Sequence, residues 1–187
     1  MHIFPVEGNF YFTDVNNKRD NSIMKIGPDS LGMSNPVSEL VSAVPVVAGG
    51  SATLRILDLC TGSGVQGINA ALFATAKGLD VDLTLVDINP RSRRFVKANL
   101  LLNDVKGTWL EGDVYGALPP APAPFHFILA NPPYWPAHNK LLFHAGGPDG
   151  ERVTAEVVRG GTPLLHENGL MVIVTPIFNP DQVTIRK

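Results

Sequence analysis

The chain has 187 residues, of which 44% are hydrophobic and 17% are charged, a composition that excludes a disordered chain and suffices for one domain with a core. The net charge is −2, so no overall positive field attracts a polyanion; this argues against nucleic acid as a partner, although a local patch would suffice. The single cysteine, Cys60, excludes an intrachain disulfide and is typical of a reducing compartment.

Targeting signals are not evident in the sequence. The sequence does not begin with the basic segment and following apolar segment of a leader peptide. No apolar stretch approaches the roughly 18 residues of a membrane span. We therefore expect a soluble, cytoplasmic protein with no membrane partner.

The first 50 residues differ from the rest. The stretches "NFYFTDV" (9–15) and "SIMKIGPDSLGM" (22–33) resemble short strands or extended pieces separated by turn residues. We expect 1–50 to be an N-terminal extended or hairpin segment that contributes to a substrate or cofactor site. "VVAGGS" (46–51) predicts a linker into a second unit, 51–187.

From Arg55 onward, strand and helix patterns alternate. Apolar and β-rich runs predict strands, and apolar residues at helical spacing predict helices. This alternation predicts an α/β fold with a Rossmann-like, mostly parallel sheet and helices on both faces, which binds ligands at the carboxyl ends of its strands. The expected strands are 55–59, 81–87, 107–113, 125–130 and 169–174, and the expected helices are 65–77, 90–103 and 150–159.

A glycine-rich turn follows the first of these strands. "DLCTGSGVQG" (58–67) places Gly62, Gly64 and Gly67 in a G-x-G-x-x-G arrangement before a helix, which lets a ligand approach the backbone next to the positive end of the helix. Asp87 ends the next strand, where its carboxylate can accept from both hydroxyls of a ribose. Up to this point a nicotinamide dinucleotide fits as well as other adenosine ligands.

Two further carboxylates favour a different ligand. Asp58 lies at a strand end where it would repel a pyrophosphate but stabilise an ammonium group, and Asp113 in "EGD" (111–113) can accept from an adenine amino group. Together with Asp87 they suit adenosine joined to a zwitterionic amino acid and a sulfonium, which is S-adenosylmethionine. Taken singly, each aspartate is equally well explained as a loop or cap residue.

These stretches resemble the motifs of class I S-adenosylmethionine-dependent methyltransferases over residues 55–175. "DLCTGSG" is similar to their first motif, "LVDINP" to the second and "EGD" to the third, while "NPPY" (131–134) resembles the fourth motif of enzymes that methylate exocyclic or amide nitrogens. The resemblance implies S-adenosylmethionine as the cofactor. It also implies that the cofactor is bound by seven residues: Asp58, Cys60, Gly62, Gly64, Asp87, Ile88 and Asp113.

The substrate is left open by two resemblances that disagree. "LDLCTGSG" and "NPPY" followed by "GGPDG" are similar to release-factor glutamine methyltransferases, whereas "SIMKIGPDSLGM" is similar to the N-terminal segment of tRNA adenine and rRNA guanine N-methyltransferases. A protein, an RNA and a small molecule all remain possible partners.

The sequence departs from the family pattern at three places. The glutamine enzymes carry a helical domain in front, whereas the front segment here is expected to be short and extended. Cys60 stands where glycine is usual, and the usual last two strands are not evident, because 13 residues follow "GLMVIV" (169–174). Either the chain is truncated or the sheet is completed differently.

The stretch "ILANPPYWP" (128–136) predicts the reacting end of the site. The nitrogen of an amide or a nucleobase is a poor nucleophile, and two acceptors that bind its N–H groups would aim its lone pair at the methyl group. The side-chain oxygen of Asn131 and the carbonyl of Pro132 can be those acceptors, with Pro133 holding the turn rigid. Tyr134 can stack on a planar substrate, and Trp135 can add a wall. A strand-ending turn with packed aromatic rings is the alternative.

Other residues are weaker predictions. Asp29 and Ser30 are expected near the cofactor, Asp149 and His144 in "FHAGGPDGE" (143–151) near the substrate, and the basic residues of 91–97 on a solvated helix face. The histidines lack the spacing of metal ligands, so we expect no metal, and His126 is expected to be structural. The whole pattern predicts an N-methyltransferase. Its alternatives are an NAD-dependent oxidoreductase and a non-catalytic S-adenosylmethionine-binding subunit or fragment.

Overall fold

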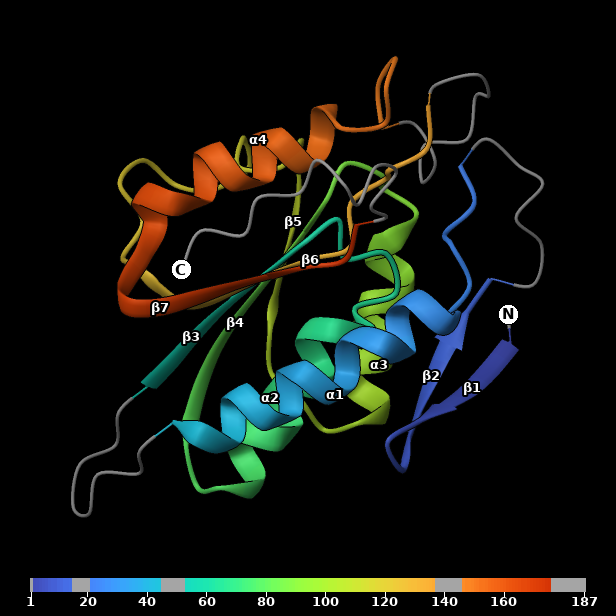
Figure 1. Ribbon diagram of the computed structural model, residues 1–187. Helices are drawn as coiled ribbons and strands as arrows, with labels where there is room; N and C mark the ends of the chain where they lie inside the picture. The colour runs from blue at the N-terminus through green and yellow to red at the C-terminus, as the bar shows by residue number, and fades with distance from the viewer. Residues whose placement is uncertain (1, 15–20, 45–52, 137–145, 176–187) are drawn as a thin grey trace.

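The computed structural model describes residues 2–14, 21–44, 53–136 and 146–175. The predicted linker at 46–51, together with His138 and His144, lies outside these ranges. Five parallel strands form one sheet, and a separate antiparallel hairpin lies at the N-terminal end of the chain (Figure 1).

The N-terminal hairpin pairs β1 (His2–Val6) with β2 (Asn9–Thr13). Its two-residue turn, Glu7-Gly8, has positive φ at both positions (49° and 80°), the conformation that matches the twist of a tight hairpin. The extended structure expected at 9–15 is therefore confirmed over β2, whereas Val15 lies outside the described residues. Asn99 fixes the hairpin to α3 (Ser92–Leu102), because its side chain accepts the N–H of Phe12 and donates to the carbonyl of Phe12.

The prediction of extended structure for 22–33 is wrong in its second half, where α1 (Pro28–Ala43) begins. Gly27, Pro28 and Gly32 are of types common in turns, but proline suits the first position of a helix because no helical N–H is needed there. Met33, Val37 and Val41 recur at four-residue spacing and are buried. Burial of this face against α2 (Val65–Ala76) stabilises a helix of low intrinsic propensity.

The sheet has the strand order β5-β4-β3-β6-β7, and every pair is parallel. The predicted strands and the three predicted helices are confirmed, with small shifts at their ends. The described residues contain no further strand in this sheet. The strands are β3 (Thr53–Leu59), β4 (Asp80–Asp87), β5 (Thr108–Glu111), β6 (Phe125–Ala130) and β7 (Leu165–Ile173). In the chain, α4 (Arg152–Gly161) and a short 3-10 helix, η1 (Thr162–Leu164), lie between β6 and β7.

Helices cover both faces of the sheet, as expected (Figure 1), and an apolar layer lies between the sheet and the helices on each face. Side chains alternate along β3: Leu54 and Ile56 face α1, α2 and α3, whereas Leu57 and Leu59 face α4. The three central strands, β3, β4 and β6, are largely buried on both faces, which is typical of parallel sheets in α/β proteins. From β3 the sheet is extended in one direction by β4 and β5, and the chain then returns to the other side of β3 to add β6 and β7. A topological switch point therefore lies between β3 and β6. Ligands of such sheets bind there, at the carboxyl ends of the strands.

Candidate functional site

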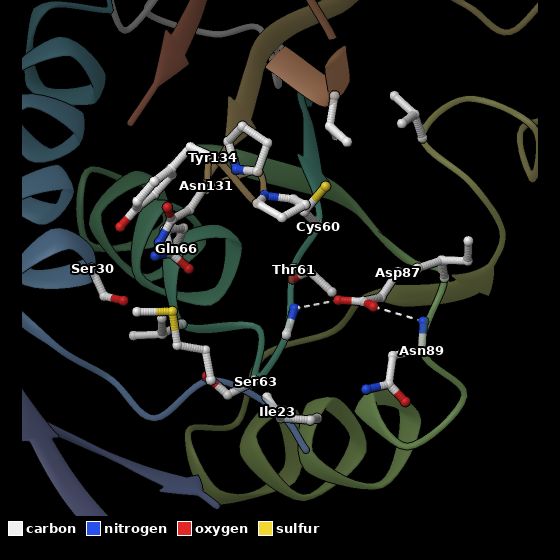
Figure 2. A pocket seen from close by; sticks show the side chains of 18 of the residues that line it. Ile23, Ser30, Cys60, Thr61, Ser63, Gln66, Asp87, Asn89, Asn131 and Tyr134 are labelled. Atoms are coloured by element: carbon white, nitrogen blue, oxygen red, sulfur yellow. Dashed lines mark hydrogen bonds between the residues drawn. The ribbon is translucent and has the colours of Figure 1, made fainter. Parts of the chain in front are cut away.

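A cavity lies at the carboxyl ends of β3, β4 and β6 (Figure 2). Segments from across the chain form its walls, including residues 22–30 before and within α1, the turn after β3, the ends of β4 and β5, the turn after β6 and the first turn of α4. Of the cofactor-binding residues implied by the resemblance and the predicted residues 131–134, all except Asp58 and Gly64 line it. The predicted residues in the wall are Cys60, Gly62, Asp87, Ile88, Asp113, Asn131, Pro132, Pro133 and Tyr134.

The turn after β3 is built from left-handed backbone positions. Cys60, Gly62 and Gly64 have φ values of 54°, 54° and 84°, a region that favours glycine because it has no Cβ. Cys60 therefore adopts this conformation at a cost, which gives a physical reason for glycine at the same position in the family pattern. Burial raises the pKa of the Cys60 thiol, so the side chain is neutral.

Asp58 lies behind the turn rather than in the wall of the cavity. Its side-chain oxygen Oδ2 accepts from the hydroxyl of Thr61 and from the backbone N–H of Gly67 at 3.0 Å. A Cβ at Gly67 would lie 2.9 Å from Asp58, so glycine is needed for this close approach. Burial raises the pKa of Asp58 to about 7, although its two hydrogen bonds oppose the shift. Asp58 thus fixes the turn and the start of α2.

Asp87 joins three parts of the site. Its Oδ2 accepts the N–H of Gly62 at 2.7 Å, and its Oδ1 accepts the N–H of Asn89 at 2.8 Å (Figure 2). Burial raises the pKa of Asp87 to about 6. Because each carboxylate oxygen has two acceptor positions, Asp87 can bind these amides and still accept hydroxyl groups from the cavity.

The segment before α1 forms one wall through contacts that the sequence did not reveal. Asp14 accepts two hydrogen bonds from Arg91, at 2.7 and 3.0 Å, and one from the N–H of Ile23. Arg91 holds the pKa of Asp14 below its usual range. Asn89 donates to the carbonyl of Asn21 at 3.1 Å. The solvated face predicted for 91–97 is therefore wrong at Arg91, which fixes this segment against the end of β4.

Asn131 lies opposite Asp87 across the glycine turn (Figure 2). Its side-chain NH₂ donates to Asp29 at 2.9 Å, and its side-chain oxygen is buried without a hydrogen-bond partner. Ser30 lines the cavity, whereas Asp29 does not. Tyr134 is in the wall, and the ring of Trp135 lies 6.3 Å from it between centroids. Trp135 is half exposed and is not part of the wall.

The glycines at 146–150 pack against the turn after β6. Gly146 donates its N–H to the carbonyl of Trp135 at 2.9 Å, and a Cβ at this glycine would lie 2.7 Å from the carbonyl oxygen of Pro133. The glycines thus allow close contact between two backbone segments. Asp149 accepts the N–H of Glu151 and does not line the cavity. Arg152, in the first turn of α4, lines it and was not predicted.

His126 is structural, as expected. It accepts the backbone N–H of Arg55 at 3.0 Å and stacks on His166 at 4.6 Å, far from the strand ends that form the cavity. Within the described ranges, no three His, Cys, Asp or Glu side chains are grouped as metal ligands. No helix in those ranges has the length and apolar character needed to cross a bilayer.

The parallel sheet, the glycine turn and the acidic strand ends define the class I methyltransferase fold. Residues 38–187 match the family described as "Methyltransferase small domain", and the chain belongs to this family. It is 27% identical over 126 residues to the ribosomal RNA small subunit methyltransferase C of Hamiltonella defensa, covering 67% of this chain and 33% of that protein. It is 32% identical over 124 residues to the release factor glutamine methyltransferase of Leptospira interrogans, covering 64% and 42%.

Solved structures agree on the fold. The 16S rRNA N2 G1207 methyltransferase of T. thermophilus, in complex with AdoMet and guanosine, aligns with a TM-score of 0.64 and 20% identity, covering 92% of this chain and 40% of that one. The putative methyltransferase SMU.776, complexed with SAH, aligns with the same TM-score at 22% identity, covering 93% and 41%. The chain spans between a third and a half of the length of the two curated relatives named above.

Proposed function

We propose that this protein binds S-adenosylmethionine and transfers its methyl group to a planar nitrogen. The observation that carries the proposal is the buried, unpartnered oxygen of Asn131, which belongs to a residue in the wall of the same cavity as the carboxylate of Asp87. The cofactor, when bound, supplies an electrophilic methyl group on a sulfonium. Membership of the methyltransferase small domain family supports this function, and no comparison supports an NAD-dependent oxidoreductase.

The cavity residues fit the cofactor in both charge and hydrogen-bonding capacity. Asp87 would accept from the ribose hydroxyls, and Asp113 from the adenine amino group. The turn from Cys60 to Gly64 would hold the methionine part against the N-terminus of α2, while Asp58 behind it, in its ionised form, would favour an ammonium group. These roles follow the predicted set and extend it with Asn89 and Ile23, which also line the cavity.

The acceptor residues would orient the reacting nitrogen. One N–H of the substrate would donate to the side-chain oxygen of Asn131 and the other to the carbonyl of Pro132, which aims the lone pair at the methyl group. Pro133 has no N–H and keeps the turn rigid. Tyr134 would stack on the planar group. No residue has to remove a proton before transfer, because the nitrogen loses its proton only after it has become cationic.

We infer that the substrate is the exocyclic amino group of guanine in ribosomal RNA. The ribosomal RNA small subunit methyltransferase C of Hamiltonella defensa is among the relatives that match, and the guanosine-bound structure of T. thermophilus has the same fold. The segment 22–33, similar to that of tRNA adenine and rRNA guanine enzymes, forms part of the cavity wall. Glutamine in a protein is the second candidate, because relatives of that kind also match. Both substrates are compatible with the expected cytoplasmic location.

The test uses labelled S-adenosylmethionine with three acceptors: hypomethylated small ribosomal subunits, deproteinised ribosomal RNA and unmethylated release factor. We expect label in ribosomal RNA, recovered as N2-methylguanosine after nuclease digestion. Label recovered as methylglutamine would support the second candidate instead. Calorimetry with S-adenosylhomocysteine and with NAD precedes the assay. Binding of NAD but not of S-adenosylhomocysteine would refute the proposal.

A further inference from the structure

We propose that Asp29 is a positioning residue, which fixes the orientation of the Asn131 amide and so keeps the side-chain oxygen of Asn131 available to the substrate nitrogen. The inference rests on the proposed function, and it assigns a role to a residue outside the part of the chain that matches the family, residues 38–187. Asp29 and Asn131 are 102 positions apart and meet at 2.9 Å.

The chemistry of the contact decides which end of the amide faces Asp29. An ionised carboxylate can only accept hydrogen bonds, so the NH₂ group of Asn131 must point toward it. A rotated amide would place two oxygen acceptors at hydrogen-bond distance, where they repel each other. The side-chain oxygen of Asn131 therefore has a single direction, away from Asp29.

That oxygen is one of few buried side-chain polar atoms without a partner among the described residues. An unsatisfied buried acceptor is unfavourable, and a free amide would rotate to relieve it. The hydrogen bond to the carboxylate of Asp29 is charge-assisted and therefore stronger than one between neutral groups. It can hold the amide in the orientation that leaves the oxygen unsatisfied until a substrate N–H reaches it.

Asp29 acts through Asn131 and not on the substrate directly, because Asp29 does not line the cavity. It lies in the first turn of α1, directly after Pro28, where the positive end of the helix stabilises a negative charge. The charge of Asp29 also acts on Tyr134. Burial is the main cause that raises the pKa of the Tyr134 hydroxyl, and the Asp29 carboxylate raises it further. A carboxylate that accepts from the amide also polarises it and makes its oxygen a better acceptor.

A double-mutant cycle tests this role on the substrate that takes up label, small ribosomal subunits or release factor. We expect Asp29→Ala to lower kcat by about tenfold to a hundredfold, with affinity for S-adenosylhomocysteine changed by less than about twofold. In the Asn131→Ala background, Asp29→Ala should cause no further loss, because its effect passes through Asn131. Asp29→Asn, which keeps the shape, should retain more activity than Asp29→Ala. Equal, additive losses in both backgrounds would overturn the inference.

The matched control is Glu39→Ala, which removes an exposed carboxylate from the same helix and should leave kcat unchanged. A second readout needs no substrate: the side-chain amide resonances of Asn131, identified by their loss in Asn131→Ala. Asp29→Ala should move them much further than Glu39→Ala does. Unmoved resonances would overturn the positioning role. Absence of methyl transfer by the unaltered protein would instead overturn the proposed function, and the resonances would still decide whether Asp29 holds the amide.

Discussion

The backbone N–H of Gly62 donates to the carboxylate of Asp87 at 2.7 Å, and this contact joins the glycine turn after β3 to the end of β4. The same carboxylate accepts the N–H of Asn89. Both strand ends that would hold the nucleoside are thus fixed before any ligand binds, which reduces the loss of conformational freedom on binding.

Replacing Asp87 tests the ribose site. In Asp87→Asn the new NH₂ group would face the N–H of Gly62 or that of Asn89, so one backbone donor loses its acceptor. We expect affinity for S-adenosylhomocysteine to fall by about tenfold to a hundredfold, the range for loss of a hydrogen bond to a charged group. Calorimetry measures it. Glu111→Gln, at an exposed carboxylate near the end of β5, is the control, and an equal loss in both variants would contradict the assignment.

The two buried carboxylates predict how stability depends on pH. The pKa of Asp58 is about 7 and that of Asp87 about 6 in the folded protein, both above the usual 3.8. The folded state therefore holds protons that the unfolded state releases. This stabilisation is complete below about pH 4 and is lost as pH rises through 6 and 7.

Thermal melts of the ligand-free protein should show this loss, with Tm falling between pH 5 and pH 8. Asp58→Asn carries no charge at this position, so its Tm should fall less over the same interval and exceed that of the unaltered protein at pH 8. Each kcal/mol corresponds to about 2–4 °C for a domain of this size. Parallel curves for the two proteins would refute the role of Asp58.

Two glycines form a matched pair for substitution by alanine. A Cβ at Gly67 would lie 2.9 Å from Asp58 and 3.0 Å from Leu83, whereas a Cβ at Gly32 in α1 has open space around it. We expect Gly67→Ala to destabilise the protein by about 1–3 kcal/mol because the core is overpacked. Gly32→Ala should stabilise it by about 0.5–1 kcal/mol through reduced backbone freedom of the unfolded chain. Denaturant melts distinguish the two, and similar midpoints would contradict the geometry.

The ion pair between Arg91 and Asp14 should matter for ligand binding as well as for stability. Asp14 also holds the N–H of Ile23, so loss of the pair loosens a wall of the cavity. Arg91→Ala should speed amide exchange at residues 22–26 and weaken binding of S-adenosylhomocysteine several-fold. Arg94→Ala, which alters an exposed residue of α3, should do neither. Unchanged exchange in Arg91→Ala would show that other contacts hold this segment.

Asn131→Ala tests the reacting end separately from the cofactor. Loss of a preorganised acceptor should reduce kcat by about a hundredfold to a thousandfold. Affinity for S-adenosylhomocysteine should stay nearly constant, because the cofactor contacts assigned above involve other residues. Single-turnover assays with labelled cofactor measure the chemical step directly. An unaffected rate would remove Asn131 from the mechanism.

The strand and helix pattern after Arg55 could be predicted because each element carries its own periodicity and its own turn residues. The glycine turn and Asp87 could also be predicted, because they lie close in sequence to the strands that position them. α1 was missed because its glycine and prolines are local turn signals. The four-residue spacing of Met33, Val37 and Val41 was the signal that indicates a helix there.

The contacts of the N-terminal segment could not be predicted for a different reason. Asp14 with Arg91, and Asp29 with Asn131, are pairs of common polar residues separated by 77 and 102 positions. No local pattern distinguishes such residues from solvated ones. Only the packing of α1 and the hairpin against the sheet domain brings them together.

These sequence separations also set an order for folding. The contact of Asp58 with Gly67 spans 9 positions and that of Gly62 with Asp87 spans 25, whereas Asp29 must find Asn131 across 102. Closing a longer loop costs more entropy and is slower. We therefore expect the nucleoside half of the site to form early in refolding and the acceptor half to form last. A newly synthesised chain would therefore bind cofactor before it could position a substrate.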